Sequence, residues 1–386
     1  MALIGIMAGS AVIGRLSDRY GYLLLFRLCP VVCGLSALCV VLFPHLNVLL
    51  PMLFVMGFAV GGEYSLDPDY ISELMPARWK EFMVGVAKAL SSMGSAIVAL
   101  VCLLMLTPQT QAAVWSRMMW IVVVLCAVMF LSRLPFAQSP AWLIVHGQRR
   151  QAGQAVKKML GKNVEIGEED FAKEPERLEK QSFAAFVRKR LRDVILTGVP
   201  WACEGLGVYG IGIFLPVLIM SLGIDTLPLE TSPMGHVTAS VRLTFVMCVV
   251  MAVGFAAGLC MVKRLSHFKM QVWGFVASGA GLLLLLAAYL LKWPSWIALT
   301  GLAVFELTLN AGPHLITFIL PSEIYSVSDR GTGAGIAASV GKTGAVLGAF
   351  FIPVVLRHFG AGTVIAISAA AMFAGAAVTS LLRVPR

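Results

Sequence analysis

Long apolar segments recur along this chain and constrain its fold more than any other feature. Two examples are "VWSRMMWIVVVLCAVMFLSRL" and "MQVWGFVASGAGLLLLLAAYLL". Each is long enough to cross a hydrocarbon core about 30 Å thick. Because lipid offers no partners for backbone polar groups, segments that cross it must be helical. The sequence therefore predicts an all-α polytopic membrane protein and makes a soluble enzyme untenable.

Composition agrees with this class. Of the 386 residues, 59% are hydrophobic and 13% are charged, and a soluble domain carries about twice that charged fraction. The many internal Gly and Ala residues allow helices to pack closely in lipid. We expect eleven membrane helices, at about 1–14, 22–41, 48–72, 82–106, 115–136, 192–221, 240–262, 269–291, 295–320, 331–356 and 361–382.

The basic residues predict the orientation, because cytoplasmic loops are enriched in Lys and Arg. The opposite loops, "FPHLN", "TPQTQAAV" and "GIDTLPLETSPMGHVTAS", contain neither. We therefore expect a multi-pass protein of the inner or plasma membrane, with a cytoplasmic C-terminus and with Met1 outside. The basic loops carry Arg15, Arg19, Arg27, Arg78, Lys80, Lys263, Arg264, Lys269, Arg330, Arg383 and Arg386.

Several other functions are disfavoured. The formal net charge of +10 follows membrane topology, so no nucleic-acid partner is expected. The eight cysteines lie in or beside apolar segments without C-x-x-C spacing, and the histidines show no metal-ligand pattern. The "GK" at 161–162 lacks the spacing of a nucleotide-binding loop. We expect no catalytic residues, no cofactor and no metal.

One sizeable polar segment, 137–191, divides the chain. It mixes both charge signs, and its basic clusters could rest on anionic lipid. We therefore expect an N-terminal bundle of five helices at 1–136, a cytoplasmic middle loop at 137–191, and a C-terminal bundle of six helices at 192–386.

The two halves repeat each other. "GRLSDRYG" at 14–21 aligns with "KRLSHFKM" at 263–270, and "ISELMPARWKEFMVGVA" aligns with "PSEIYSVSDRGTGAGIA" at nearly the same spacing. This places Asp18 opposite His267 and Glu73 opposite Glu323. Because the motifs recur on the same membrane face, the repeat is parallel, an arrangement in which the substrate binds near mid-membrane between the halves.

These motifs resemble signatures of the major facilitator superfamily. "GRLSDRYG" is similar to its loop signature between helices two and three. "SELMPARWKE", "SPAWLIVHGQ" and "LPSEIYSVSDRGTGAGIA" resemble signatures of its sugar and metabolite:proton symporter branches. The resemblance implies a twelve-helix, two-bundle fold whose first helix is missing here, a small-molecule substrate, coupled protons and a monomer in the lipid bilayer.

The loop signature implies a cytoplasmic latch between helices. Asp18 could meet the exposed amides of a neighbouring helix N-terminus, and the glycines would allow a tight turn. Tyr22 and Leu23 depart from the pattern, because basic residues usually stand there, and His267 replaces the acid in the second copy. An ordinary polar interhelical turn is the alternative. The residues expected in gating are Gly14, Asp18, Arg19, Gly21, Glu73, Arg78, Glu323 and Arg330.

Ionisable residues deep in the membrane are candidates for transport, since burying them without a role is costly. Glu63, Glu204 and Glu306 each fall near the middle of an expected helix, and so does Lys342. The acids could exchange protons. The lysine could hold an anionic substrate or act as a counter-charge.

Three stretches resemble the phosphate and organic-anion symporters. "GGEY" at 61–64 implies a proton-linked acid at Glu63 and adds Tyr64 as a substrate-binding candidate. "GKTGA" at 341–345 implies an anion-binding Lys342. "WACEGLGVYG" matches their tryptophan–aspartate–tyrosine stretch at Trp201 and Tyr209, but Gly205 stands where the aspartate belongs and the acid is next door, at Glu204.

Structural roles compete with these assignments. The acids could make interhelical hydrogen bonds, and the two aromatic residues could be ordinary packing. Asp67 and Asp69 could be solvated or paired with Arg78 or Lys80. Lys88 lies near a helix end, and we expect it to snorkel to the membrane surface.

The sequence thus predicts a proton-coupled secondary transporter of a small, anionic metabolite working by alternating access. An exporter of hydrophobic compounds and a truncated, non-transporting remnant or sensor are the alternatives. The remnant is suggested by the N-terminus, because 14 apolar residues are short for a span. We expect either a start inside a longer reading frame or a truncation with impaired activity.

Overall fold

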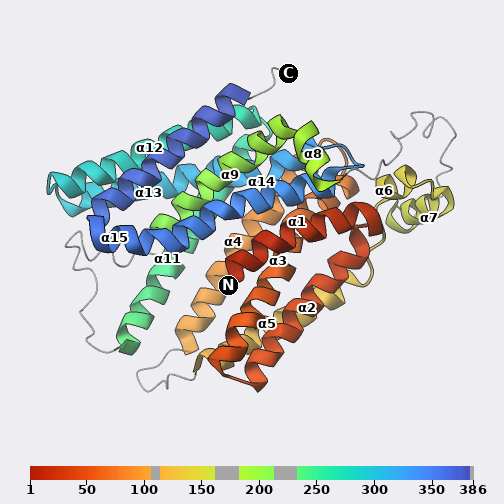
Figure 1. The fold of residues 1–386 in the computed structure, drawn as a ribbon, viewed down its shortest axis with the longest axis horizontal. Coiled ribbons are helices and arrows are strands. Elements are labelled where there is room, and N and C mark those ends of the chain that lie inside the picture. The colour runs from red at the N-terminus through yellow and green to blue at the C-terminus, as the bar shows by residue number, and fades with distance from the viewer. Residues whose placement is uncertain (106–113, 161–181, 213–232, 383–386) are drawn as a thin grey trace. The chain divides into compact units, whose positions relative to one another are not determined.

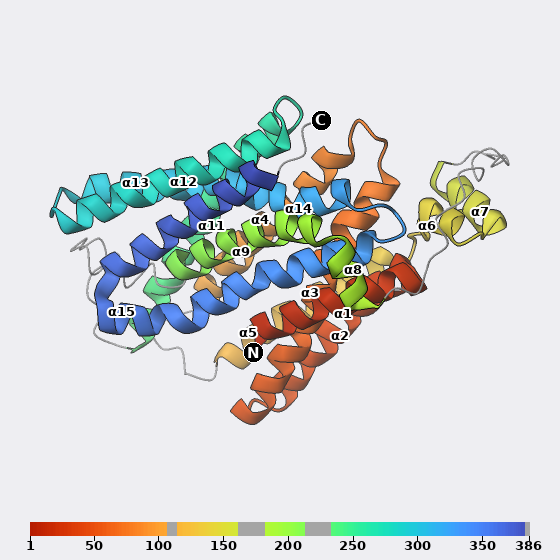
Figure 2. The ribbon, with the colours of Figure 1, turned by 45° about the horizontal axis from the view of Figure 1, so that its top comes forward.

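Helices make up the regular structure throughout the part of the chain that the computed structural model describes, residues 1–105, 114–160, 182–212 and 233–382 (Figures 1 and 2). In chain order they are α1 (Ala2–Tyr20), α2 (Tyr22–Leu42), α3 (Leu46–Leu74), α4 (Lys80–Met105), α5 (Val114–Arg133), α6 (Pro140–Val145), α7 (Arg149–Leu160), α8 (Phe183–Lys189), α9 (Leu191–Gly212), α11 (Pro233–Val262), α12 (His267–Leu290), α13 (Ser295–Ala311), α14 (Pro313–Ile324) and α15 (Arg330–Leu382).

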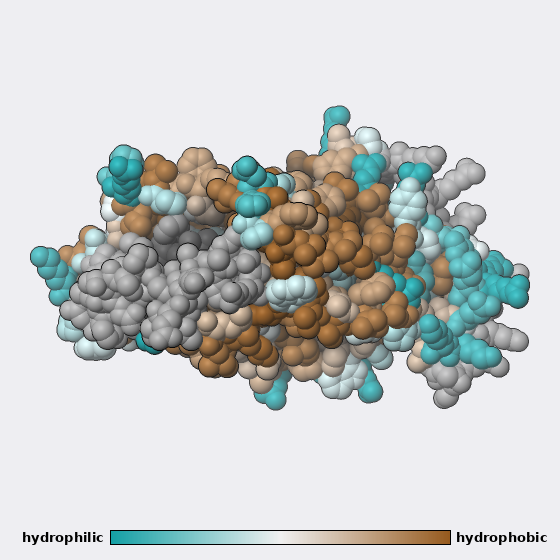
Figure 3. All heavy atoms as spheres, turned by 90° about the horizontal axis from the view of Figure 1, so that it is seen from below, coloured by the Kyte–Doolittle hydropathy of each residue, from teal (hydrophilic) through white to brown (hydrophobic). Residues whose placement is uncertain are grey.

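The lengths and composition of these helices confirm an all-α polytopic membrane protein. Within the described ranges, eight stretches are long and apolar enough to span a membrane, with α13 and α14 counted as one stretch, and α5 is a shorter apolar helix. On the face drawn in Figure 3, hydrophobic side chains cover much of the described surface. Such a surface is stable against lipid and unstable in water.

The first helix is longer than expected. The prediction ended it at residue 14 and treated the following charged segment as a turn, but α1 continues to Tyr20. Its 19 residues give a length of about 28 Å at 1.5 Å per residue. The turn is confined to Gly21, whose φ of 85° is a conformation that glycine adopts without steric penalty. The charged segment is therefore the last turns of a helix.

Two expected helices differ at a glycine. The single helix expected at 295–320 is broken at Gly312, whose φ of −120° and ψ of −92° are not helical, so α13 and α14 are separate. The long α15 contains both of the last two expected helices, separated by a kink at Gly360 with φ 79°. The expected helix at 192–221 is seen as α9 to Gly212, and its remainder lies outside the described residues.

The expected middle loop at 137–191 contains three short helices, and its central part, 161–181, lies outside the described residues. Ser139 caps α6 by accepting a hydrogen bond from the Trp142 amide, and Ser182 caps α8 by accepting one from the Ala185 amide. Serine at these positions satisfies an amide that the helix itself leaves unpaired.

The described chain divides into two compact units, which do not follow chain order. The first unit comprises residues 1–84, 119–197 and 319–339, and the second comprises 85–118, 198–318 and 340–386. The division into bundles at 136 and 192 remains a prediction.

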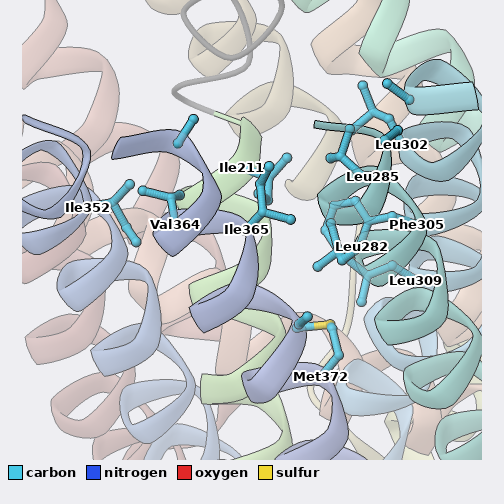
Figure 4. Close-up of a cluster of buried hydrophobic side chains, with 14 of the residues drawn as sticks. Ile211, Leu282, Leu285, Leu302, Phe305, Leu309, Ile352, Val364, Ile365 and Met372 are labelled. Atoms are coloured by element: carbon cyan, nitrogen blue, oxygen red, sulfur yellow. The ribbon is translucent and has the colours of Figure 1, made fainter. Parts of the chain in front are cut away.

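Each unit has its own apolar core. In the first unit, Tyr22, Leu66, Tyr70 and Trp142 are among the buried residues. The second unit has a larger core between α9, α12, α13 and α15 (Figure 4). Its members include Ile211, Leu282, Leu285, Leu302, Phe305, Leu309, Ile352, Val364, Ile365 and Met372.

Glycines let α1 and α3 approach closely in the first unit. A Cβ added at Gly9 would lie 2.0 Å from the Phe58 carbonyl oxygen, and one added at Gly61 would lie 2.3 Å from the Ile6 carbonyl oxygen. Both obstacles are backbone atoms, which cannot rotate away. Close contact through small residues is the usual way in which helices associate in lipid.

This contact predicts a stability effect. Gly9→Val should force α1 away from α3 and destabilise the protein by about 1–3 kcal/mol, the usual cost of overpacking. Gly94→Val on α4 is the matched control, because a Cβ there meets nothing within 4 Å. Thermal unfolding in detergent measures both variants. Equal melting temperatures for the two would contradict the proposed packing.

Candidate functional site

A buried carboxylate is the centre of the candidate site in the second unit. Glu204 lies on α9 and is 3% exposed. Its Oε2 accepts a hydrogen bond from the Thr317 hydroxyl of α14 at 3.0 Å, and its Oε1 lies 3.5 Å from Nε2 of His314 on the same helix. Two elements that are far apart in sequence therefore hold this acid, as expected for an ionisable group with a role inside a membrane.

Two buried lysines lie near Glu204. Lys342 on α15 is 6% exposed and Lys88 on α4 is 7% exposed. Both lie close enough to act electrostatically on Glu204 and on His314. The expectation that Lys88 snorkels is wrong: its ammonium group is buried, with Nζ 5.6 Å from the centre of the Phe318 ring.

Aromatic rings line the same region. Nζ of Lys342 lies 5.6 Å from the centre of the Tyr209 ring. Trp201 packs edge-on against Phe318, with ring centres 6.4 Å apart. The structure thus brings Trp201, Tyr209, Lys342 and Glu204 into one unit. Cation–aromatic contacts of this kind favour a charged ammonium group away from water.

The position of the acid at 204 rather than 205 has a steric reason. A Cβ added at Gly205 would lie 3.0 Å from the Gly341 carbonyl oxygen and 3.1 Å from the Ala345 amide nitrogen. Helices α9 and α15 therefore touch at this glycine, and an aspartate there would have to push them apart. Glu204, one residue earlier, points elsewhere on the helix, because successive residues are rotated by about 100°.

Glu306 on α13 joins the site through its neighbours. It is 6% exposed. The Asn310 amide nitrogen donates to the Glu306 carbonyl oxygen at 2.7 Å and lies 3.3 Å from Glu306 Oε2. The Asn310 oxygen lies 2.8 Å from Nδ1 of His314. A continuous set of polar contacts therefore runs from Glu306 through Asn310 and His314 to Glu204, across the break between α13 and α14.

A second acid, Glu63, lies in the first unit, where its side chain is 16% exposed and held in an ion pair. Arg133 on α5 donates to both of its carboxylate oxygens, at 2.6 and 2.5 Å. The same guanidinium donates to the Phe26 carbonyl oxygen at 2.6 Å and stacks on the Phe26 ring, 3.7 Å from its centre. Such a two-point contact fixes orientation as well as charge. Tyr64 is half-buried beside Glu63 on α3.

The expected capping of a helix N-terminus by Asp18 is confirmed within the first unit. Asp18 Oδ1 accepts from the Gly331 amide at 2.9 Å, and Oδ2 accepts from the Thr332 amide at 2.7 Å. These amides belong to the first turn of α15, which lacks internal partners and attracts negative charge. Gly14 lies at the same crossing, where an added Cβ would be 2.3 Å from the Gly331 carbonyl oxygen.

The repeated glutamate of the first half makes a buried ion pair. Glu73 Oε1 accepts from Arg330 at 3.0 Å, and the side chains are only 2% and 9% exposed. The Ser139 hydroxyl donates to the other Glu73 oxygen. Glu323, its counterpart, is half-buried and acts electrostatically on Lys80. These contacts suit a gate, and the gating role itself remains a prediction.

The remaining gating candidates are Arg19, Arg78 and Gly21. Arg19 and Arg78 are exposed. At Gly21, an added Cβ would lie 1.7 Å from Nε2 of Gln138, the movable end of a side chain, and the φ of 85° would strain a residue other than glycine.

The sequence analysis did not propose a functional role for three residues: Lys88 and His314 beside Glu204 in the second unit, and Arg133 beside Glu63 in the first unit. Lys88 and Arg133 lie near the ends of their helices, where a basic residue usually reaches water. His314 had a usable signal, because Glu306, Asn310 and His314 follow one another at intervals of four residues. That spacing places side chains on one face of a helix.

Known proteins resemble the chain over nearly its full length. Residues 1–385 match the family described as sugar (and other) transporter. The inner membrane metabolite transport protein YgcS of Escherichia coli (strain K12) is 23% identical over 382 residues, covering 98% of this chain and 80% of YgcS. Inorganic phosphate transporter 1-1 of Oryza sativa subsp. japonica is 26% identical over 396 residues, covering 91% of this chain and 72% of that protein.

A solved structure shows the same fold. The proton:xylose symporter XylE of the major facilitator superfamily, bound to 6-bromo-6-deoxy-D-glucose, superposes with a TM-score of 0.78. It is 19% identical, and the match covers 97% of this chain and 83% of XylE.

The long apolar helices and the family match identify a polytopic transport protein. Its fold is that of the major facilitator superfamily. The chain belongs to the sugar (and other) transporter family of that superfamily.

The ion pair in the first unit yields a prediction. Glu63→Gln or Arg133→Gln alone should destabilise the protein by roughly 3–5 kcal/mol, because each leaves a buried charge without its partner. The double substitution should cost clearly less than the sum of the two. Thermal unfolding in detergent of the two single variants and the double variant measures this coupling.

The half-exposed pair between Arg190 and Asp193, 3.4 Å apart, supplies the control. Its coupling should be below about 1 kcal/mol. Additive effects at Glu63 and Arg133 would show that their contact contributes no stability.

Proposed function

We propose that the protein is a proton-coupled secondary transporter that carries a small anionic metabolite by alternating access. One observation carries the proposal: in the second unit, two buried lysines, Lys88 and Lys342, both act electrostatically on one buried carboxylate, Glu204. These three side chains together have a charge of +1 when all are ionised. Buried ammonium groups in a membrane protein attract a counter-charge. A substrate anion would supply it.

The acid would link the anion to a proton. While Glu204 is ionised, its carboxylate competes with the substrate for the two ammonium groups. When Glu204 takes a proton, this competition ends, and the ammonium groups attract the anion more strongly. Proton and anion therefore favour each other's binding, and by linkage this coupling is reciprocal.

Other residues would support the cycle. Tyr209 and Trp201 would form an apolar wall beside the anion, and Tyr64 is a further candidate for substrate contact. Glu306 would hold Asn310 in place, and Asn310 in turn contacts His314. Glu63, held by Arg133 in the first unit, would respond to protons only when this ion pair opens.

The latch completes the proposal. The contacts of Asp18 with α15 and of Glu73 with Arg330 would hold one state of the transporter, with the C-terminus on the cytoplasmic side of the cell's inner membrane. We expect the monomer to be the working form.

The relatives include transporters of both anionic and neutral substrates. A phosphate transporter is among the proteins that resemble the chain, and the structural neighbour XylE is a proton symporter of xylose, a neutral sugar. The lysine pair favours an anion over a neutral sugar. An exporter of hydrophobic compounds would gain nothing from two buried ammonium groups.

Uptake into proteoliposomes with an imposed inward proton gradient tests the proposal. The probes are D-glucuronate, inorganic phosphate and D-xylose. We expect gradient-driven uptake of at least one anion and at least about a tenfold loss in Lys342→Gln and in Lys88→Gln, since removing a charge-assisted contact raises the transition-state barrier. Lys263→Gln is the control, because Lys263 is exposed.

Two outcomes would overturn the proposal. If D-xylose is the only probe transported, and neither lysine substitution changes its uptake, the proposed anionic substrate is refuted. If anion uptake is the same with and without the proton gradient, the proposed proton coupling is refuted.

A further inference from the structure

The contacts around His314 determine which of its ring nitrogens carries hydrogen. The neighbouring Asn310 is oriented by its own helix: its amide nitrogen donates to the Glu306 carbonyl oxygen at 2.7 Å. The Asn310 oxygen is therefore the atom that faces His314, 2.8 Å from Nδ1. An amide oxygen can only accept a hydrogen bond. Nδ1 must consequently be the donor and must bear a hydrogen.

The other ring nitrogen then faces an acid. In a neutral imidazole with hydrogen on Nδ1, Nε2 has a lone pair and can only accept. Nε2 lies 3.5 Å from Glu204 Oε1, which in an ionised carboxylate also has only lone pairs. Two acceptors facing each other in a buried place repel. One proton between them removes the conflict, either as a carboxylic acid donating to Nε2 or as an imidazolium donating to the carboxylate.

The surroundings leave Oε1 as the atom for this proton. The other oxygen, Oε2, already accepts from the Thr317 hydroxyl at 3.0 Å. The Phe255 ring on α11 packs against the imidazole, with ring centres 5.2 Å apart. The titratable groups acting on the pair are Lys88 on α4 and Lys342 on α15. Glu306 on α13 is connected to His314 through Asn310.

We propose that His314 and Glu204 together hold one shared proton, and that this proton is the one coupled to the anion. The existence of the shared proton rests on the hydrogen-bond geometry alone. Its role in transport rests on the function proposed above. Asn310, kept in place by Glu306, is a positioning residue that selects the tautomer of His314.

Charge counting links the shared proton to the substrate. With the proton present, the pair is neutral and the two lysines present a charge of +2. Without it, the pair carries −1 and the total falls to +1. The anion is therefore attracted more strongly when the proton is bound. When the proton leaves Oε1 or Nε2, the carboxylate regains its charge and weakens the hold of the lysines on the anion.

Nitrogen NMR of the protein in lipid nanodiscs tests the shared proton without any substrate. Protein labelled with 15N-histidine is compared with His314→Gln, which identifies the His314 signals by their loss. We expect a protonated Nδ1 at neutral pH, with Nε2 either accepting a hydrogen bond or protonated as well. In Asn310→Leu the fixed tautomer should be lost, and both tautomers should appear. A protonated Nε2 with a bare Nδ1 in the unmodified protein would overturn the proposal.

Transport of D-glucuronate tests the role of the pair. In His314→Gln we expect gradient-driven accumulation of D-glucuronate to fall at least tenfold more than exchange of labelled for unlabelled D-glucuronate across the membrane. Glu204→Gln should behave in the same way. His358→Gln is the matched control, because His358 is exposed on α15.

The outcomes separate the two proposals. If the unmodified protein accumulates D-glucuronate and His314→Gln does so equally, the role of the pair is refuted while the proposed function stands. If the unmodified protein shows no gradient-driven uptake of any probe, the proposed function fails, and the NMR result still decides whether the proton is shared.

Discussion

The cost of placing charge away from water is the constraint on which the rest of this molecule depends. Several ionisable residues of the described helices have a specific partner: Glu63 pairs with Arg133, Glu73 pairs with Arg330, and Asp18 accepts from the first amides of α15. Removing one member of such a pair leaves an isolated charge, which is far less favourable than the pair. The helices must therefore keep their register, because a shift of one residue would separate partners by a rotation of about 100°.

The second unit departs from this pattern of one-to-one pairing. There, Lys88 and Lys342 act on one acid, and a histidine reaches that acid by its second ring nitrogen. The histidine, His314, lies two residues after Gly312, where the helix path is interrupted between α13 and α14. Interrupted helices are common at the binding sites of transporters, because the free backbone groups and the mobile ends can contact ligands. The first unit thus contains ion pairs between single partners, whereas in the second unit Lys88, Lys342 and His314 all act on Glu204.

Much of the fold could be predicted from the apolar runs, because lipid forces every such run to be helical. The end of α1 could not, since "GRLSDRY" is polar enough to resemble a loop, and its contacts with α15 through Asp18 and Gly14 are long-range. The break at Gly312 was equally hidden, because glycine in a membrane helix more often marks close packing than an interruption. The burial of Glu204, Glu306 and Lys342 was predictable, because each lies near the middle of a long apolar segment. The burial of Lys88 was not, since only tertiary packing decides whether a long basic side chain reaches water.

The contact of Asp18 with Gly331 and Thr332 has a consequence for how the protein is made. It joins positions 313 and 314 residues apart, so the carboxylate of α1 is inserted long before its partner amides leave the ribosome. Until then, the negative group near the start of the chain has no helix end to cap. Chains fold progressively as they are synthesised, and contacts of such long range form late. The first unit therefore cannot complete this contact until residues 331 and 332 have been synthesised.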